Sequence, residues 1–132
     1  MTAADFDGWA RTGLGFAVFA EPAPGRNSVC RFFTTAFPPT SSHFYAPRGL
    51  GCEPVFGNAD WQFEGDVFFA PLPDPEGRCP AGTVPVYRLY NGGQGGAPGH
   101  RFTTSADARA AMLTAGYVAE GTGIGVGMCA PE

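Results

Sequence analysis

The stretch Val86-Tyr87-Arg88-Leu89-Tyr90-Asn91, followed by Gly99-His100-Arg101-Phe102-Thr103-Thr104, decides the fold of this chain. Both segments are rich in β-branched and aromatic residues, which favour strands. The glycine-rich loop at 91–98 between them permits the chain to reverse its direction. We therefore expect a pair of antiparallel strands at 84–90 and 101–104.

The same pattern occurs earlier, where Val29-Cys30-Arg31-Phe32-Phe33 is followed by Ser42-His43-Phe44-Tyr45. The arginine precedes the histidine by twelve positions in both copies. A third element, an aromatic residue beside a glycine-containing turn, recurs three times. Its aromatic residue occupies the same position in each repeat: Trp9, Trp61 and Tyr117. Internal repeats of this kind determine the architecture before any local pattern does.

The repeats divide a single domain, residues 1–132, into three parts: the tail of a partial unit at 6–27, a first full unit at 28–73 and a second at 79–132. Each full unit is expected to run strand, turn, strand, helix or loop, strand. The other strands are expected at 28–34, 43–46, 61–70 and 117–128, with a strand pair inside 6–20. A complete first unit would need a strand pair before residue 6, so we expect a chain that is truncated at its N-terminus or a first unit that is naturally partial.

One helix is expected after Ser105, which is a suitable N-cap, with Asp107 in the first turn and Gly116 as the stop. A face of small and apolar residues predicts that this helix lies on a sheet: Ala108, Ala111, Met112 and Ala115. The corresponding segment 47–60 of the first unit is rich in glycine and proline, so a regular helix is not expected there.

These elements predict an α+β domain made mainly of antiparallel strands, with one short helix. Units packed around a shared aromatic core with approximate rotational symmetry would give a propeller-like or trefoil-like closure, which protects the sheet edges. An open β-sandwich is the alternative.

The composition excludes several classes of protein. A net charge of −4 disfavours sequence-independent binding to nucleic acid. No apolar stretch approaches the roughly twenty residues of a membrane span. Residues 1–10 carry Asp5 and Asp7 and lack the apolar core of a signal peptide, so the chain is expected to be a mature fragment.

Four cysteines in a small chain rich in glycine and proline indicate disulfides and an oxidising compartment, extracellular or periplasmic. Three pairings are possible for four cysteines. We favour Cys30–Cys52 and Cys79–Cys129, because each bond then closes within one repeat unit. The spacing of zinc ligands is absent, and no metal or cofactor is expected.

The chain resembles a family of extracellular bacterial repeat domains of unknown function. Units of that family read Tyr-Arg-x-Tyr-Asn, His-Phe-Tyr-Thr-Thr, a short helix and Gly-Trp-x-x-Glu-Gly, and the matching segments here are 86–91, 100–104, the helix after Ser105 and 116–121. The first full unit departs from the pattern at Cys30-Arg31-Phe32-Phe33 and at Ala46. Members commonly carry three units and are often appended to secreted hydrolases, which implies a binding or anchoring role.

Two histidines and two glutamates recur in phase and could serve as general bases or as paired glycosidase carboxylates. Single-site catalysis normally breaks such symmetry, so the recurrence favours a structural role instead. In that role each glutamate pairs with Arg31 or Arg88 or caps a turn, and each histidine ties its strand to Arg31 or Arg88 or to a backbone carbonyl. No residue is assigned to catalysis, and the structural set is Arg88, His43, His100, Trp9, Trp61, Tyr117, Glu64 and Glu120.

Aromatic rings can stack on sugars, and arginine and amide side chains supply planar hydrogen bonds. The loop at 91–99, polar and glycine-rich, is either a contact loop for a ligand or a flexible connector. On these grounds the candidate ligand-binding residues are Tyr90, Asn91, Gln94, Arg101, Arg31 and Tyr45.

We therefore expect a non-catalytic extracellular binding module, with a glycan or cell-wall polymer as its partner. The alternative is a structural or protein-interaction appendage, fused to or paired with another secreted chain. A hydrolase that uses one of the histidines with Glu64 or Glu120 is the least favoured function.

Overall fold

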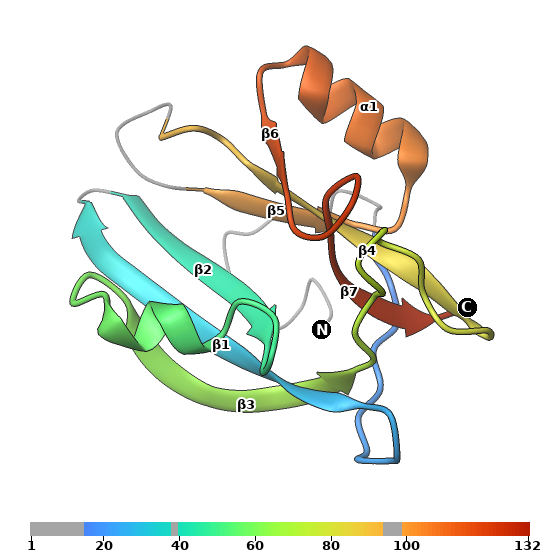
Figure 1. Cartoon of the computed structure of the whole chain (residues 1–132). Coiled ribbons are helices and arrows are strands. Elements are labelled where there is room, and N and C mark those ends of the chain that lie inside the picture. Colours follow the sequence, from blue (N-terminus) through green and yellow to red (C-terminus); the bar gives the residue numbers. More distant parts are fainter. Residues whose placement is uncertain (1–14, 38–39, 94–98) are drawn as a thin grey trace.

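The computed structural model describes residues 15–37, 40–93 and 99–132, and these form two antiparallel sheets, one from each full unit (Figure 1). The first sheet has the order β2-β1-β3, and the second has the order β5-β4-β6, with β7 also paired to β4. The strands are β1 (Asn27–Phe37), β2 (Thr40–Pro47), β3 (Gln62–Ala70), β4 (Thr83–Tyr90), β5 (His100–Thr103), β6 (Val118–Glu120) and β7 (Val126–Pro131).

The register between the central strand and the histidine-bearing strand is the same in both sheets. In each unit the histidine lies opposite the aromatic residue that follows the arginine by two positions. Because side chains at positions i and i+2 of a strand share a face, arginine, aromatic ring and histidine stand together on one face of each sheet. The paired residues are Phe33 with His43 and Tyr90 with His100.

The third strand of each unit turns at a Glu-Gly pair. Gly65 and Gly121 both have a positive φ, 128° and 115°, which residues with a side chain rarely adopt. A Cβ at Gly121 would also lie only 2.5 Å from the carbonyl oxygen of Val126. In the first unit the strand bulges here and continues as β3, whereas in the second it breaks into β6 and β7. The single final strand expected at 117–128 is therefore two strands.

The core joins the two sheets. One buried cluster takes residues from both of them: Val29, Ala70, Val86, Met128 and Ala130, with Phe16, Tyr45, Phe68 and Phe102 packed around it. A second cluster lies within the first unit: Cys30, Phe32, Phe44, Ala46 and Cys52, with Val55 and Trp61 at its border. The cluster that spans both units joins the two sheets, and the first sheet has a further core of its own.

Both predicted disulfides are present. Cys30 is bonded to Cys52 and Cys79 to Cys129, with Cα–Cα distances of 5.9 Å and 5.8 Å. The first bond fixes the start of a short 3₁₀-helix, Glu53–Gly57, in the segment where a regular helix was not expected. The disulfide thus holds a segment whose proline and glycine content prevents regular helical hydrogen bonding.

The helix α1 (Ala106–Thr114) has the predicted start, because the Ser105 hydroxyl accepts a hydrogen bond from the backbone N–H of Ala108 at 3.1 Å. The predicted packing face is wrong in part, since no residue of α1 is buried and both Ala111 and Ala115 are exposed.

The side chain of Arg109, rather than an apolar face, fixes the position of the helix. Arg109 Nη2 donates to the carbonyl oxygen of Ile124 at 2.7 Å, and the Arg109 guanidinium lies 5.5 Å from the centroid of the Tyr87 ring. In Figure 1, α1 lies over the second sheet, at the edge of the molecule away from the first sheet.

The fold class is confirmed at the level of mainly antiparallel sheets with one α-helix. Within the described ranges the sheets close into no barrel, so the open β-sandwich alternative fits. The strand pair expected inside 6–20 is reduced, over its described part, to one bridge between Phe19 and Phe69. No helix in the described part of the chain is long and apolar enough to cross a membrane.

Removal of either disulfide is expected to destabilise the protein by about 3–4 kcal/mol, because the closed loops of 22 and 50 residues restrict the unfolded chain. Urea unfolding of the Cys30→Ser/Cys52→Ser and Cys79→Ser/Cys129→Ser double variants measures the loss. Peptide mapping without reductant should yield the two expected linked peptides, and a Cys30–Cys79 peptide would contradict the structure.

Candidate functional site

Three charged or polar side chains from three adjacent strands meet on the first sheet. Arg31 Nε on β1 donates to Glu64 Oε1 on β3 at 2.8 Å, and His43 Nε2 on β2 lies 3.2 Å from the same oxygen. The ring of Phe33 packs on the His43 ring, with 4.6 Å between the centroids. These four residues, Arg31, Phe33, His43 and Glu64, are called the first cluster below.

The second sheet repeats this arrangement with the in-phase residues. Arg88 Nε donates to Glu120 Oε1 at 3.2 Å, and His100 Nε2 lies 3.0 Å from that oxygen. Tyr90 stacks on His100 with 5.0 Å between the centroids and 27° between the planes. Arg88, Tyr90, His100 and Glu120 are called the second cluster. The arginine–glutamate pairs expected from the repeat therefore form in both units.

The sequence brings each cluster together through register and through the Glu-Gly turn. The central strand supplies the arginine and the aromatic ring, one neighbouring strand supplies the histidine, and the other supplies the glutamate. One carboxylate oxygen then ties three strands together, because a carboxylate oxygen can accept more than one hydrogen bond.

The two clusters differ in the solvent exposure of their side chains. The side chains of Arg88 and His100 are 13% and 10% exposed, whereas those of Arg31 and His43 are 38% and 41% exposed. Phe44 of the first unit contributes to this difference. Its ring packs against His100 at 4.7 Å and lies 5.0 Å from the Arg88 guanidinium.

Trp61, also from the first unit, packs at 6.5 Å from the His100 ring. The second cluster is therefore a contact between the two units. Among the described residues, the rings paired with His43 are those of Phe33 and Tyr45, both from its own sheet. The first cluster thus keeps an accessible surface.

Burial changes the acid–base chemistry of the second cluster. Desolvation lowers the pKa of His100, the charge of Glu120 opposes this effect, and the charge of Arg88 adds to it. Desolvation also lowers the pKa of Arg88, against the opposing charge of Glu120. Nδ1 of His100 is buried and has no hydrogen-bond partner among the described residues. The net effect is a lowered pKa, which disfavours the protonated form of His100 in the folded chain.

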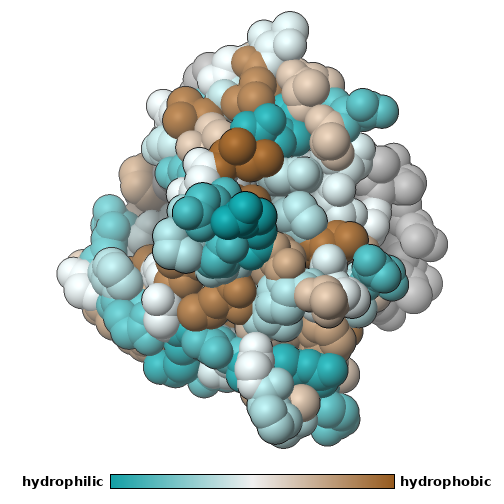
Figure 2. All heavy atoms as spheres, turned by 45° about the vertical axis from the view of Figure 1, so that its right-hand side comes forward, coloured by the Kyte–Doolittle hydropathy of each residue, from teal (hydrophilic) through white to brown (hydrophobic). Residues whose placement is uncertain are grey.

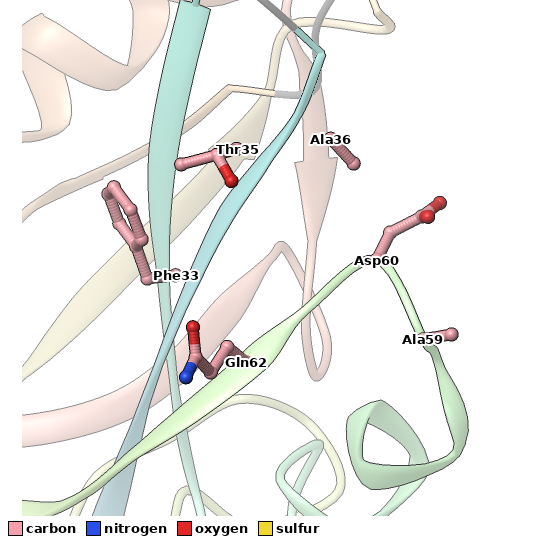
Figure 3. Close-up of a pocket in the computed structure, with 6 residues that line it drawn as sticks. All are labelled: Phe33, Thr35, Ala36, Ala59, Asp60 and Gln62. Carbon is pink, nitrogen blue, oxygen red and sulfur yellow. The ribbon is translucent and has the colours of Figure 1, made fainter.

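A small open pocket of about 230 Å³ lies beside the first cluster (Figure 3). Phe33 belongs both to the first cluster and to the lining of the pocket. In Figure 3 the side chains of Phe33, Thr35 and Gln62 extend from two neighbouring strands, while Asp60 lies on the loop before β3. The pocket is lined by Phe33, Thr35, Ala36, Ala59, Asp60 and Gln62.

The structure distributes the predicted ligand-binding residues over separate places. Arg31 belongs to the first cluster and Tyr90 to the second. Tyr45 is half-buried between His43 and Phe102.

Among the described residues, the other candidate ligand-binding residues, in and after the loop at 91–99, also lie in separate places, as do the repeated aromatic residues. Asn91 Oδ1 accepts hydrogen bonds from the backbone N–H groups of Gly93 and Gly99, so this side chain closes the base of its loop. Arg101 lies over the ring of Tyr117 at 5.7 Å. Gln94 and Trp9 lie outside the described residues.

Sequence reasoning missed Phe33, Asp60 and Gln62. Phe33 could have been found, because it occupies the position of Tyr90 in the repeat. Asp60 and Gln62 carry no such signal, since the second unit has Gly116 and Val118 at the corresponding places. In the described part of the chain, no group of three or more His, Cys, Asp or Glu residues could hold a metal ion.

A family model described as "Domain of unknown function (DUF5648)" matches residues 1–127. The chain belongs to the DUF5648 family. This match spans nearly the whole chain and agrees with the expected membership of an uncharacterised domain family. Comparisons with curated proteins and with solved structures gave no match.

The two clusters of this DUF5648 chain provide a matched pair of substitutions. Glu120→Gln should lower the free energy of unfolding by about 2–3 kcal/mol, because it weakens a partly buried ion pair and leaves Arg88 without its counter-charge. Glu64→Gln should cost less than about 1 kcal/mol, because its pair is exposed to water. Urea unfolding of both variants tests this, and equal losses would contradict it.

Stability should also fall with acid because of His100. In the unfolded chain, His100 takes up a proton near the ordinary histidine pKa of 6.5. In the folded chain the pKa of His100 is lower, so the unfolded state binds more protons below pH 6.5. The free energy of unfolding therefore decreases as the pH falls below that value. We expect wild type to be less stable at about pH 5.5 than at about pH 7.5, and His100→Gln to remove most of that difference. His43→Gln is the control and should retain it. An unchanged acid effect in His100→Gln would exclude this assignment.

Proposed function

We propose that the protein is a non-catalytic extracellular module that binds carbohydrate or a cell-wall polymer through the first cluster and the adjacent pocket. The observation that carries the proposal is the difference between the two copies. The second cluster is covered by Phe44 and Trp61, while the first has the same arginine, histidine and glutamate with accessible surface beside a pocket.

The chemistry of this surface suits a sugar. Small-molecule sites combine an apolar wall with a few fixed polar groups, and here the Phe33 ring supplies the wall. Arg31 uses Nε to bind Glu64, and its other guanidinium N–H groups remain as donors in a fixed plane. Thr35, Asp60 and Gln62 add donors and acceptors around the pocket.

The glutamates support binding rather than hydrolysis. A glycosidase needs two carboxyl groups in different environments, about 5–10 Å apart on either side of one bond. Glu64 and Glu120 instead belong to different clusters, and each is paired with an arginine and a histidine. Each histidine has its Nε2 against a glutamate, with no room for a water between the two groups.

The two disulfides support an oxidising location, extracellular or periplasmic. The family resemblance, in which similar domains are appended to secreted hydrolases, supports a role in bringing an attached partner to its substrate. On the face of the molecule shown in Figure 2, hydrophobic residues are scattered among hydrophilic ones. A protein-interaction surface would favour a larger continuous apolar patch, so this face gives less support to the alternative of a protein-interaction appendage.

Pull-down of the oxidised protein with insoluble polysaccharides and isolated cell walls tests the proposal. Wild type should be retained, and Arg31→Ala should weaken retention about tenfold, because it removes planar donors from the surface. Arg78→Ala is the matched control, since Arg78 is exposed on the linker between the units and should have no effect. Thermal unfolding checks that each variant folds. Absence of retention on every polymer would refute the function.

A further inference from the structure

Among the residues that the structure describes, the accessible surface around the first cluster has no unpaired cation to attract an anion. Arg31 and His43 both contact the Glu64 carboxylate, so the guanidinium charge is already compensated. The pocket adds Asp60, and none of its lining residues in the described part of the chain is basic. The chain as a whole carries a net charge of −4. Phosphate or carboxylate groups on a ligand would therefore meet a negative local field.

The second cluster shows which shape of group can pack against such a set of side chains. There the ring of Phe44 approaches His100 at 63° between the planes, and the Arg88 guanidinium lies over its face. A flat apolar ring thus covers a cluster in which the arginine, histidine and glutamate are already paired. The first cluster presents the same groups, with Phe33 in the place of Tyr90.

The pocket limits the size of the occupant. A volume of about 230 Å³ falls below the roughly 300–1,000 Å³ of sites for drug-sized ligands, so it accommodates one small ring with its substituents. The lining combines the Phe33 ring with the hydroxyl of Thr35, the amide of Gln62 and the carboxylate of Asp60. These groups can bind hydroxyl and amide substituents at the edge of a ring.

We propose that the first cluster and its pocket bind an uncharged sugar unit of a neutral glycan. The apolar face of the sugar packs on Phe33 and His43, and its polar edge is hydrogen-bonded by Asp60 and Gln62. This inference rests on the proposed function and narrows it, since it excludes anionic wall polymers as the ligand of this surface.

Titration calorimetry with defined sugars tests the ligand class. The neutral probes are hexasaccharides of N-acetylglucosamine, glucose and mannose, and the anionic probes are oligogalacturonate and polyglycerol phosphate. At least one neutral probe should bind, with a Kd that changes less than about twofold between about 0.05 and 0.5 M NaCl, because no ion pair is formed. The anionic probes should not bind at either salt concentration.

Two variants test the site. Phe33→Ala and Gln62→Ala should each weaken binding of the neutral probe by about tenfold or more, because each removes a wall or an edge of the pocket. Gln62 is exposed, so its variant keeps the test valid if Phe33→Ala fails to fold. Val118→Ala is the control, since Val118 occupies the position of Gln62 in the second unit and should leave the Kd unchanged.

The outcomes separate this inference from the proposed function. Binding of anionic probes alone, with a steep loss at high salt, would overturn the inference and leave carbohydrate binding intact. Neutral binding that both variants leave unchanged would overturn the site. Failure to bind any of these probes would overturn the inference, and absence of retention on every polymer as well would overturn the proposed function. Self-association in sedimentation that Phe33→Ala abolishes would likewise assign the surface to a second copy of the chain.

Discussion

The partly buried ion pair between Arg88 and Glu120, shared with His100, is the constraint on which the rest of the structure depends. One oxygen of Glu120 receives both partners, so three strands of the second sheet are tied at a single point. The first unit then covers that point with Phe44 and Trp61. This part of the contact between the units is therefore built around a polar group, beside the apolar cluster that joins the two sheets, and Arg88 and His100 depend on it for their low exposure. Partly buried charges of this kind are costly unless they are paired, so the geometry of the second sheet is strongly specified.

The disulfides take over where the chain cannot form regular secondary structure. The segment after β2 forms only a short 3₁₀-helix, and Cys52 fixes its start to the central strand of the first sheet. The second bond ties the start of the second unit, before β4, to β7. Since many turns carry glycine, whose conformational freedom raises the entropy of the unfolded chain, covalent bonds that restrict that chain matter more here than in a helical domain of similar size.

Duplication gives the same residues different roles. The arginine, histidine and glutamate make equivalent contacts in both units, and the distances agree within a few tenths of an ångström. Their surroundings differ, because the second copy is covered by residues of the preceding unit. Internal pairing therefore explains why the cluster recurs, and exposure decides which copy is available to a ligand. A residue can thus be repeated for structural reasons and still contribute to binding in one of its copies.

Much of the fold followed from the sequence by itself. The twelve-residue spacing from arginine to histidine placed the strand pairs, Ser105 placed the helix start, and closure within units gave both disulfides. In-phase recurrence also anticipated the pairing of Glu64 and Glu120 with arginine. These features are local or periodic, so they can be detected along the chain. Only the tertiary structure decided that Phe44 and Trp61 cover one cluster and not the other, that Asp60 and Gln62 border a pocket with Phe33, and that Arg109 rather than an alanine face holds the helix. The physical reason is that burial depends on how the two sheets pack together, and a repeat that is equivalent in sequence does not reveal which of its copies faces the neighbouring unit.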